Sequence, residues 1–358
     1  MFDTYVWFKI FQFCDDVTKT NLVLSSNKFN NFKKYVTYFN IRTTNIDICK
    51  IFNEFPNITN LQNHFTINKQ FIQNTKIIQN LTSLDCNQCP DNSINIDVSK
   101  LINLVSLSCD RYIKIKGIDN LTNLTHLSCS FCSNINLVLL TNLTSLNCSN
   151  CQNIQNIELL TNLTMLDCSY CPFIEYIDNL VNLTSLNCSY CSNFRSVNEL
   201  TNLTSLNCGN RFLDGIENLN NLISLDLSFC YINEIGKNLI SLKTFKCSYQ
   251  QPKNIQILTN LTSLNCEFCK NINIKKLINL TELNCSYCKN IKNVETLTNL
   301  TSLNCSNCQD IDDIKNLINL TSLTCYDCHN IDKLTNLVNL KNYYHANKYP
   351  SKLHNHKK

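Results

Sequence analysis

Glycine, proline and charged residues are all scarce in this sequence. Its 358 residues include only 4 glycines, 5 prolines and 1 tryptophan, and charged residues make up 16%. The glycines are too widely scattered to form a loop that cradles a phosphate. The formal net charge of +4 is small for this length, so the composition argues against a nucleic-acid partner.

Long apolar runs are also missing. No stretch reaches the roughly 18 apolar residues of a membrane-spanning helix, so no membrane span is expected. The apolar start contains Asp3 and Lys9 and has no small-residue cleavage site, which is not typical of a secretion signal. We therefore expect a cytoplasmic protein that is not secreted, in which the 24 cysteines stay reduced.

A repeated segment dominates the sequence. From Leu143 the chain reads LTSLNCSNCQNIQNIELLTN, then LTMLDCSYCPFIEYIDNLVN, then LTSLNCSYCSNFRSVNELTN. The leucine that opens this unit, called here the landmark leucine, recurs every 19 or 20 residues from Leu104 to Leu340, after a longer step from Leu81. A fixed period of this length is typical of a solenoid, in which each coil packs on its neighbours.

The order of residues inside the unit predicts its local structure. Apolar and small polar residues alternate over residues 145–149, which favours a short strand with one buried face. A coil of 20 residues leaves little room for a helix, so turns or single 3₁₀ turns are expected on the outer side. The side chains expected to point inward in this coil are Leu143, Leu146, Cys148, Cys151, Ile154 and Ile157.

The pattern L-x-x-L-x-C-x-x-C-x-x-I-x-x-I resembles the leucine-rich repeat, with cysteine where asparagine is usual. The resemblance covers residues 81–342, and residues 46–80 are interpreted as degenerate repeats. It implies an α/β solenoid: a right-handed coil with a parallel concave sheet and a turn-rich convex side. It also implies a protein that binds other proteins. Residues 343–358 are expected to form a basic tail, either merely solvated or binding an anionic surface.

The N-terminal residues 1–45 lack the repeat and are expected to form a small helical segment. Ile10-Phe11-Gln12-Phe13-Cys14, Asn21-Leu22 and Ser26-Asn27-Lys28-Phe29 resemble the F-box. Similar proteins with Asn-rich repeats occur in large DNA viruses of amoebae, which implies the host cytoplasm for a viral member. The F-box resemblance implies a Skp-type adaptor as partner and a substrate-recognition role in a cullin-type ubiquitin ligase. The adaptor-binding residues it implies are Ile10, Phe11, Phe13, Leu22 and Phe29. The alternative is a plain cap on the solenoid, which would then be an interaction or structural scaffold.

Cysteine pairs with the spacing Cys-x-x-Cys recur through the repeats, as in Cys148/Cys151 and Cys168/Cys171. Two such pairs also match the spacing of a zinc ribbon. The pairs follow the repeat phase, however, and each cysteine lies in a slot that the solenoid must bury. We interpret them as a structural ladder of small apolar thiols, with no metal and no cofactor.

No catalytic constellation is evident, because none of the six histidines has a partnered acid, serine or cysteine at a recognisable spacing. We therefore expect no enzyme.

The outward strand positions are mostly serine and asparagine, so the aromatic residues just before the second cysteine slot stand out. They are either protein-binding anchors or half-buried spacers between coils. The candidate substrate-binding residues are Phe131, Tyr170, Tyr190, Phe229, Lys246, Tyr249, Phe268 and Tyr287.

Overall fold

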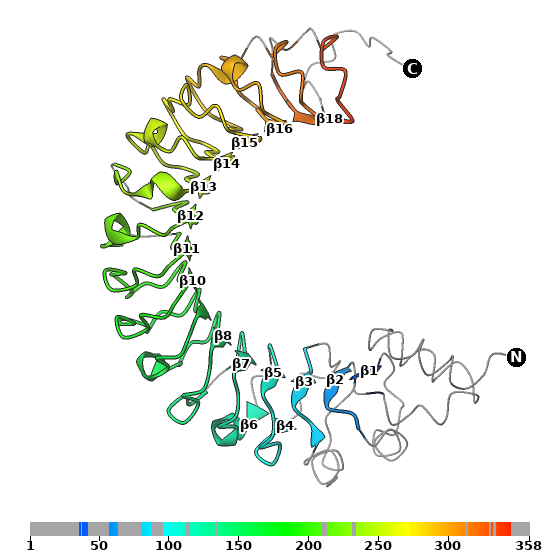
Figure 1. Ribbon diagram of the computed structural model, residues 1–358, viewed down its shortest axis with the longest axis vertical. Coiled ribbons are helices and arrows are strands. Elements are labelled where there is room, and N and C mark those ends of the chain that lie inside the picture. The colour runs from blue at the N-terminus through cyan, green and yellow to red at the C-terminus, as the bar shows by residue number, and fades with distance from the viewer. Residues whose placement is uncertain are drawn as a thin grey trace, which may run out of the picture. The chain divides into compact units, whose positions relative to one another are not determined.

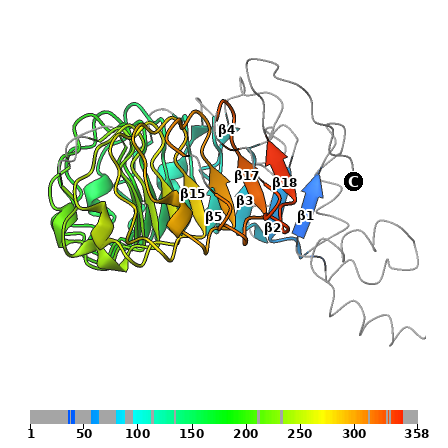
Figure 2. The ribbon, with the colours of Figure 1, turned by 90° about the horizontal axis from the view of Figure 1, so that it is seen from above.

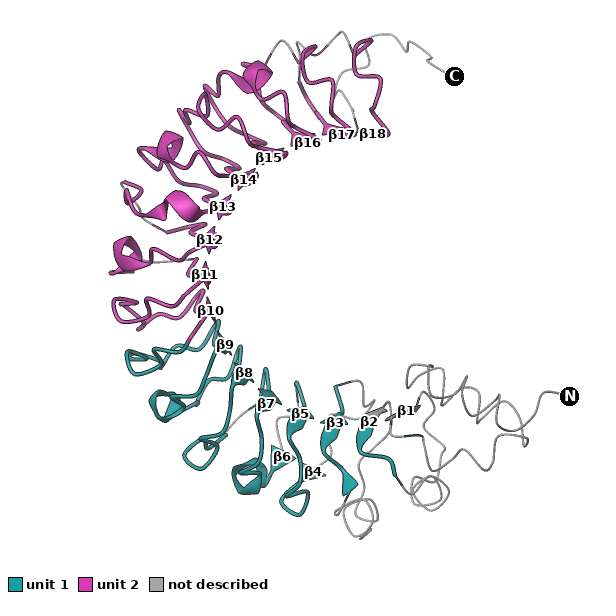
Figure 3. Cartoon of the chain, in the orientation of Figure 1, with its two compact units in different colours: residues 1–182 teal, residues 183–358 magenta. Residues whose placement is uncertain are grey.

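The computed structural model forms a parallel β-solenoid, in which each coil contributes one short strand followed by turns (Figure 1). The described residues are 36, 38–41, 57–63, 80–87, 96–111, 115–132, 135–209, 213–230, 234–311, 314–328, 331 and 334–344. The chain divides into two compact units, residues 1–182 and 183–358, and each is described by itself (Figure 3). The solenoid predicted from the repeat is confirmed.

Unit 1 contains one main parallel sheet and a small second one. The main sheet pairs consecutive coils from β1 to β9. Its strands are β1 (Tyr38–Ile41), β2 (Asn60–Asn63), β3 (Ser83–Asp85), β5 (Ser106–Ser108), β7 (His126–Ser128), β8 (Ser145–Asn147) and β9 (Met165–Asp167). The second sheet pairs β4 (Ile96–Asp97) with β6 (Ile115–Lys116). Two 3₁₀ turns follow strands, η2 (Ile118–Asn120) and η3 (Ile157–Leu159).

Unit 2 continues the same coil design with one parallel sheet from β10 to β18. The strands β17 and β18 run side by side in the same direction (Figure 2). The strands are β10 (Ser185–Asn187), β11 (Ser205–Asn207), β12 (Ser224–Asp226), β13 (Thr244–Lys246), β14 (Ser263–Asn265), β15 (Glu282–Asn284), β16 (Ser302–Asn304), β17 (Ser322–Thr324) and β18 (Asn342–Tyr344). The 3₁₀ turns are η4 (Ile216–Asn218), η5 (Leu239–Ser241), η6 (Ile255–Ile257) and η7 (Val294–Thr296).

Equivalent residues of neighbouring coils pair across each sheet. In unit 2, for example, Leu264 lies opposite Leu283, with serine or glutamate and asparagine on either side. The central leucine of β14 and of β15 is buried, while its two neighbours are partly or fully exposed. All six positions predicted to point inward in the coil of Leu143 are at most 4% exposed. The core is therefore a stack of equivalent apolar side chains, one set from each coil.

Asparagine explains how the chain manages with so few glycines. The residue before η3, η6 and η7 has a positive φ, and it is Asn156, Asn254 and Asn293 respectively. Asparagine tolerates this left-handed conformation better than other non-glycine residues. The same position before η4 is Gly215, where a Cβ would lie 2.4 Å from the side chain of Asn198, so only glycine fits there.

Parts of the predicted domain organisation lie outside the described residues. Ile10, Phe11, Phe13, Leu22 and Phe29 lie there, as does the tail after residue 344. Strand β1 (Tyr38–Ile41) falls within the range 1–45 that the sequence assigned to a helical segment. Ile58 of the degenerate region is fully buried, and β2 just after it pairs with β3 as an ordinary coil does. No helix in the described ranges is long and apolar enough to cross a membrane.

Candidate functional site

A ladder of cysteine thiols runs through the core of each unit. The second cysteine of a coil donates its S–H to the backbone carbonyl of the first cysteine slot in the preceding coil. In unit 1 the Sγ of Cys171 lies 3.0 Å from the carbonyl oxygen of Cys148. In unit 2 the Sγ of Cys288 lies 2.9 Å from that of Cys266. Each of these carbonyls also accepts a backbone N–H of its own coil, from Cys151 to Cys148 and from Cys269 to Cys266, both at 3.1 Å. The thiol therefore adds a second hydrogen bond that links one coil to the next, as the predicted ladder requires.

The environment of the ladder keeps the first cysteines protonated. The neighbouring thiol of Cys171 and burial together hold the pKa of Cys148 well above its ordinary value. The thiol of Cys288 and burial do the same for the pKa of Cys266. A metal ligand must be a thiolate, so this environment opposes metal binding. Among the described residues no group of three or more His, Cys, Asp or Glu side chains is arranged to hold a metal ion.

Two further ladders lie on the surface, and sequence reasoning missed them. In unit 1 the side-chain amide of Asn142 donates to the carbonyl of Thr122 at 2.9 Å, and the hydroxyl of Thr144 donates to the carbonyl of Thr125 at 3.1 Å. In unit 2 Asn299 and Thr301 make the equivalent bonds to Ile278 and Thr281, at 3.0 and 3.1 Å. The recurring Asn-Leu-Thr tripeptide therefore links each coil to the one before it. The tripeptide keeps the same place in the repeat although it is exposed, and this regularity in the sequence could have indicated a structural role.

The aromatic candidates occupy one position of the coil, directly before the second cysteine slot. Phe131, Tyr170, Tyr190, Phe229, Tyr249, Phe268 and Tyr287 all have a positive φ between 57° and 65°. Six of these side chains are 38–51% exposed, for example 47% for Tyr170 and 51% for Tyr249, and Phe268 is more buried than the others. In unit 1 the guanidinium of Arg111 lies 5.9 Å from the centre of the Phe131 ring, within the range of a cation–π contact.

Unit 2 brings four of these residues into one continuous stack, called here the aromatic stack. Ring centres are 4.7 Å apart between Phe229 and Tyr249, 4.5 Å between Tyr249 and Phe268, and 4.4 Å between Phe268 and Tyr287. The angles between ring planes are 22°, 12° and 6°. The rings are therefore spacers that pack on each other, and they also expose their edges to solvent. The sequence left two alternatives open for these residues, spacers between coils and protein-binding anchors, and the same rings can serve as both.

The backbone does not need an aromatic residue at this position. Asn150 and Asn307 occupy it in other coils with φ of 61° and 59°. A bulky side chain in the left-handed conformation costs about 1–2 kcal/mol, which asparagine largely avoids. Each stacked ring pair contributes about 0.5–1.5 kcal/mol, so the three pairs offset part of the strain of the four residues. Four such residues in consecutive coils form a rigid, partly apolar strip on an otherwise polar surface.

Few other side chains depart from the polar pattern of the strand face. Lys246 on β13 lies 3.8 Å from Asp226 on β12, in an exposed ion pair. Glu282 on β15 accepts a hydrogen bond from the Ser263 hydroxyl at 3.1 Å. Lys246 is thus the one candidate outside the aromatic positions, and it is 56% exposed.

The fold and the cysteine ladder define the class of this structure as a leucine-rich-repeat solenoid. No protein-family model matches the chain, and no curated protein matches its sequence. The functional domain of InlJ from Listeria monocytogenes, which includes a cysteine ladder, has a similar structure with a TM-score of 0.64 and 23% identity, covering 83% of this chain and 69% of that one.

Two further solved structures support the same fold. The internalin InlF of Listeria monocytogenes matches with a TM-score of 0.57 and 23% identity, over 71% of this chain and 83% of that one. A leucine-rich-repeat protein of Leptospira interrogans matches with a TM-score of 0.56 and 19% identity, over 85% and 82%. At these identities the similarity concerns the fold.

Proposed function

We propose that this chain is a non-enzymatic leucine-rich-repeat protein whose protein-binding surface is centred on the aromatic stack of unit 2, with Lys246 beside it on the strand face. The stack of Phe229, Tyr249, Phe268 and Tyr287, in which every ring but Phe268 is close to half exposed, is the observation that carries the proposal. Aromatic residues held rigidly at a surface lose little entropy on binding, and they are enriched among the residues that dominate binding energy.

The solved structures give general support for a binding role. The leucine-rich-repeat ectodomain of the plant receptor kinase GASSHO1/SCHENGEN3 from Arabidopsis thaliana, with a TM-score of 0.52 and 15% identity over 86% of this chain and 49% of that one, was solved in complex with CASPARIAN STRIP INTEGRITY FACTOR 2. Phe131 and Tyr170 of unit 1 and Tyr190 of unit 2 occupy the same place in their coils, and each is proposed as a protein-binding residue of its own unit.

The test replaces stack residues by asparagine, because asparagine already occupies the same backbone conformation in Asn150 and Asn307. Peptides are selected from a displayed library on the wild-type protein, and their binding to the double variant Tyr249→Asn/Phe268→Asn is then measured. We expect a loss of at least tenfold in affinity. The control is Tyr176→Asn, an aromatic residue that is 72% exposed and lies outside the stack. Selected peptides that bind the double variant as well as the wild type would show that the stack is not the contact surface.

We further propose, from the F-box-like motif, that residues 1–45 bind a Skp-type adaptor and that the protein acts in the cytoplasm as a substrate-recognition subunit of a cullin-type ubiquitin ligase. Ile10 and Phe11 are expected to carry the contact, because interfaces of this kind concentrate their energy in a few apolar anchors. Phe13, Leu22 and Phe29 complete the motif.

A pulldown with purified adaptor tests the ligase role. The double variant Ile10→Ala/Phe11→Ala should lose the adaptor while its thermal transition stays unchanged. The competing function is a scaffold without any ubiquitin link, in which residues 1–45 only cap the solenoid. The scaffold function is favoured if the wild type binds no adaptor at micromolar concentration and the double variant unfolds at a lower temperature than the wild type.

A further inference from the structure

One coil of unit 2 lacks a side chain that its neighbours all have. The position six residues before each landmark leucine, called here the turn-side slot, holds a buried aliphatic residue. The residues in this slot of unit 2 include Val197, Ile216, Ile255, Ile274, Val294 and Ile314, none more than 8% exposed. In the coil that precedes Leu242 the slot is occupied by Gly236.

The backbone of Gly236 keeps the geometry of the slot. Its carbonyl accepts a hydrogen bond from the Leu239 N–H at 3.2 Å, as the carbonyl of Ile255 does from Leu258 at 3.0 Å. This backbone hydrogen bond is kept, but the 3₁₀ turn of the coil, η5, begins at Leu239, three residues after the slot, whereas η4 and η6 begin at the slot residue itself. The preceding residue, Ile235, is buried, and its N–H donates to the carbonyl of Lys253 at 3.2 Å.

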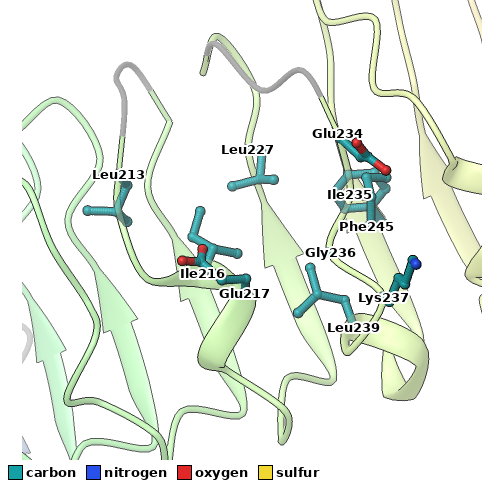
Figure 4. Close-up of a pocket in the computed structure, with 10 residues that line it drawn as sticks. All are labelled: Leu213, Ile216, Glu217, Leu227, Glu234, Ile235, Gly236, Lys237, Leu239 and Phe245. Atoms are coloured by element: carbon teal, nitrogen blue, oxygen red, sulfur yellow. The ribbon is translucent and has the colours of Figure 1, made fainter.

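A pocket of about 370 Å³ occupies this place (Figure 4). Its apolar lining includes Ile216, Leu227, Ile235, Leu239 and Phe245, all at most 8% exposed. A volume of this size is in the range of small-ligand sites and exceeds what a single missing aliphatic side chain would leave. An apolar hollow of this kind is a place where burial of a ligand's hydrocarbon group is favourable.

The rim of the pocket carries charged side chains, and their net formal charge is negative. Glu217, Glu234 and Lys237 are exposed residues that line it, giving two carboxylates and one ammonium. Glu234 accepts a hydrogen bond from the side-chain amide of Asn254, which holds the carboxylate in place. In Figure 4, Glu217 lies on one side of the opening and Glu234 on the other. A cationic group on a ligand would meet a carboxylate from either side.

We propose that this pocket binds a small ligand that joins an aliphatic or phenyl group to a primary ammonium. The hydrocarbon group takes the place of the missing slot side chain against Ile216 and Leu239, and the ammonium lies between Glu217 and Glu234 at the rim. This site is separate from the aromatic stack, so its test does not depend on the proposed protein-binding function.

Three probes of equal size test the assignment: 2-phenylethylammonium, the neutral 2-phenylethanol and the anionic phenylacetate. Binding is followed through the methyl NMR signals of Ile216, Ile235 and Leu239. The ammonium should bind tightest, with a Kd of about 1 mM or below, the affinity that a ligand of this size can reach. Glu217→Gln and Glu234→Gln should each weaken the ammonium by about 2- to 5-fold, as for exposed ion pairs, and leave the alcohol unchanged.

A variant that places a side chain in the turn-side slot at Gly236 gives the most direct test of the pocket. A Cβ added at Gly236 would meet its nearest neighbours, the Cα and Cβ of Glu217, at 3.5 Å, an ordinary contact, so Gly236→Ile is expected to fold and, by filling part of the pocket, to weaken binding of all three probes by at least tenfold. Gly236→Ala should fold with weakened binding. The control Val294→Ile adds the same kind of bulk in the same slot of another coil and should leave binding unchanged. Undiminished binding to Gly236→Ile, or equal affinity for the three probes, would overturn the proposal.

Discussion

The second cysteine of each coil meets two requirements that few side chains combine. It must be small and apolar enough to pack in the core, and it must donate a hydrogen bond to a buried carbonyl of the preceding coil. The Sγ of Cys308 does both, at 2.9 Å from the carbonyl oxygen of Cys285 and with no solvent exposure. The same carbonyl also accepts the N–H of Cys288 at 3.1 Å, so alanine at position 308 would remove the second of its two hydrogen bonds, a loss of about 0.5–1.5 kcal/mol.

A charged side chain should be tolerated at the strand positions that face water, and it should destabilise the protein at the buried positions of the cysteine ladder. Cys148→Asp places a carboxylate at a fully buried position, and we expect it to lower the free energy of unfolding by at least about 3 kcal/mol. Asn147→Asp should change it by a few tenths of a kcal/mol, because Asp167 already occupies that position and accepts the N–H of Ser169 at 3.0 Å. Thermal unfolding followed by circular dichroism compares the two. Equal shifts would contradict the assignment of buried and exposed positions.

Stability should fall at alkaline pH because the first cysteines have raised pKa values in the folded state. Below about pH 8.5 these thiols are protonated in both states, and their contribution is constant. Above it the unfolded chain loses protons that the folded chain retains, so the free energy of unfolding falls by up to about 1.4 kcal/mol per pH unit for each such thiol. The residues concerned include Cys148, Cys266 and Cys285.

Unfolding midpoints measured from pH 7 to pH 10 test this linkage. Because the hydrogen bond with Cys305 lowers the folded-state pKa of Cys328 to about 7, the wild type should gain slightly in stability from pH 7 to about pH 8.5 and decline beyond it. The variant Cys148→Val removes one titrating group and should decline less steeply. A flat profile to pH 10 would mean that the thiols titrate equally in both states.

At the scale of one element, the aromatic stack links four coils of unit 2 through side chains that the backbone does not require. Phe268 contacts a ring on each side, whereas Tyr287 ends the series of ring contacts described here. The φ of 58° at Phe268 is a strained conformation for a phenylalanine, and the stacking offsets part of its cost.

A double-mutant cycle should detect this coupling. Phe268→Asn and Tyr287→Asn remove the rings while keeping a residue suited to the backbone, and we expect a coupling energy of about 0.5–1.5 kcal/mol between the two sites. The pair Phe268 and Tyr326, whose side chains lie in non-adjacent coils, is the control and should be additive. Additivity at Phe268 and Tyr287 as well would show that the rings stack without stabilising the coils.

At the scale of the whole molecule, the repeat explains both what the sequence predicted and what it missed. The period of Leu143 to Leu163 predicted the coil, its buried positions and its short outer turns, because each follows from alternation and spacing alone. The inter-coil bonds of Asn142 and Thr144 were missed, since a hydrogen bond between coils depends on a carbonyl 19 or 20 residues away. The stack of Phe229 to Tyr287 was visible only as a recurring residue type. The pocket at Gly236 required knowing which neighbours surround one slot.

The absence of a metal remains a prediction for the purified protein. The motive is the ladder geometry, in which thiols such as Cys171 are engaged as donors to carbonyl oxygens and are not held as thiolates. Elemental analysis should find less than about 0.1 zinc per chain, and a chelator should leave the unfolding temperature unchanged, because no folding energy comes from a metal. One zinc or more per chain, with unfolding on chelation, would replace the ladder by a metal site.

The hydrogen-bond ladders also bear on how such a chain can change over generations. The donors of these ladders, such as the thiol of Cys288, the amide of Asn299 and the hydroxyl of Thr301, each meet a backbone carbonyl at an equivalent place in the coil before. Unequal recombination that removes or duplicates one full period leaves the new neighbours with the same pairing as the old ones. Copy number can therefore drift while the fold persists, and selection acts on length and on surface residues with few constraints from the core.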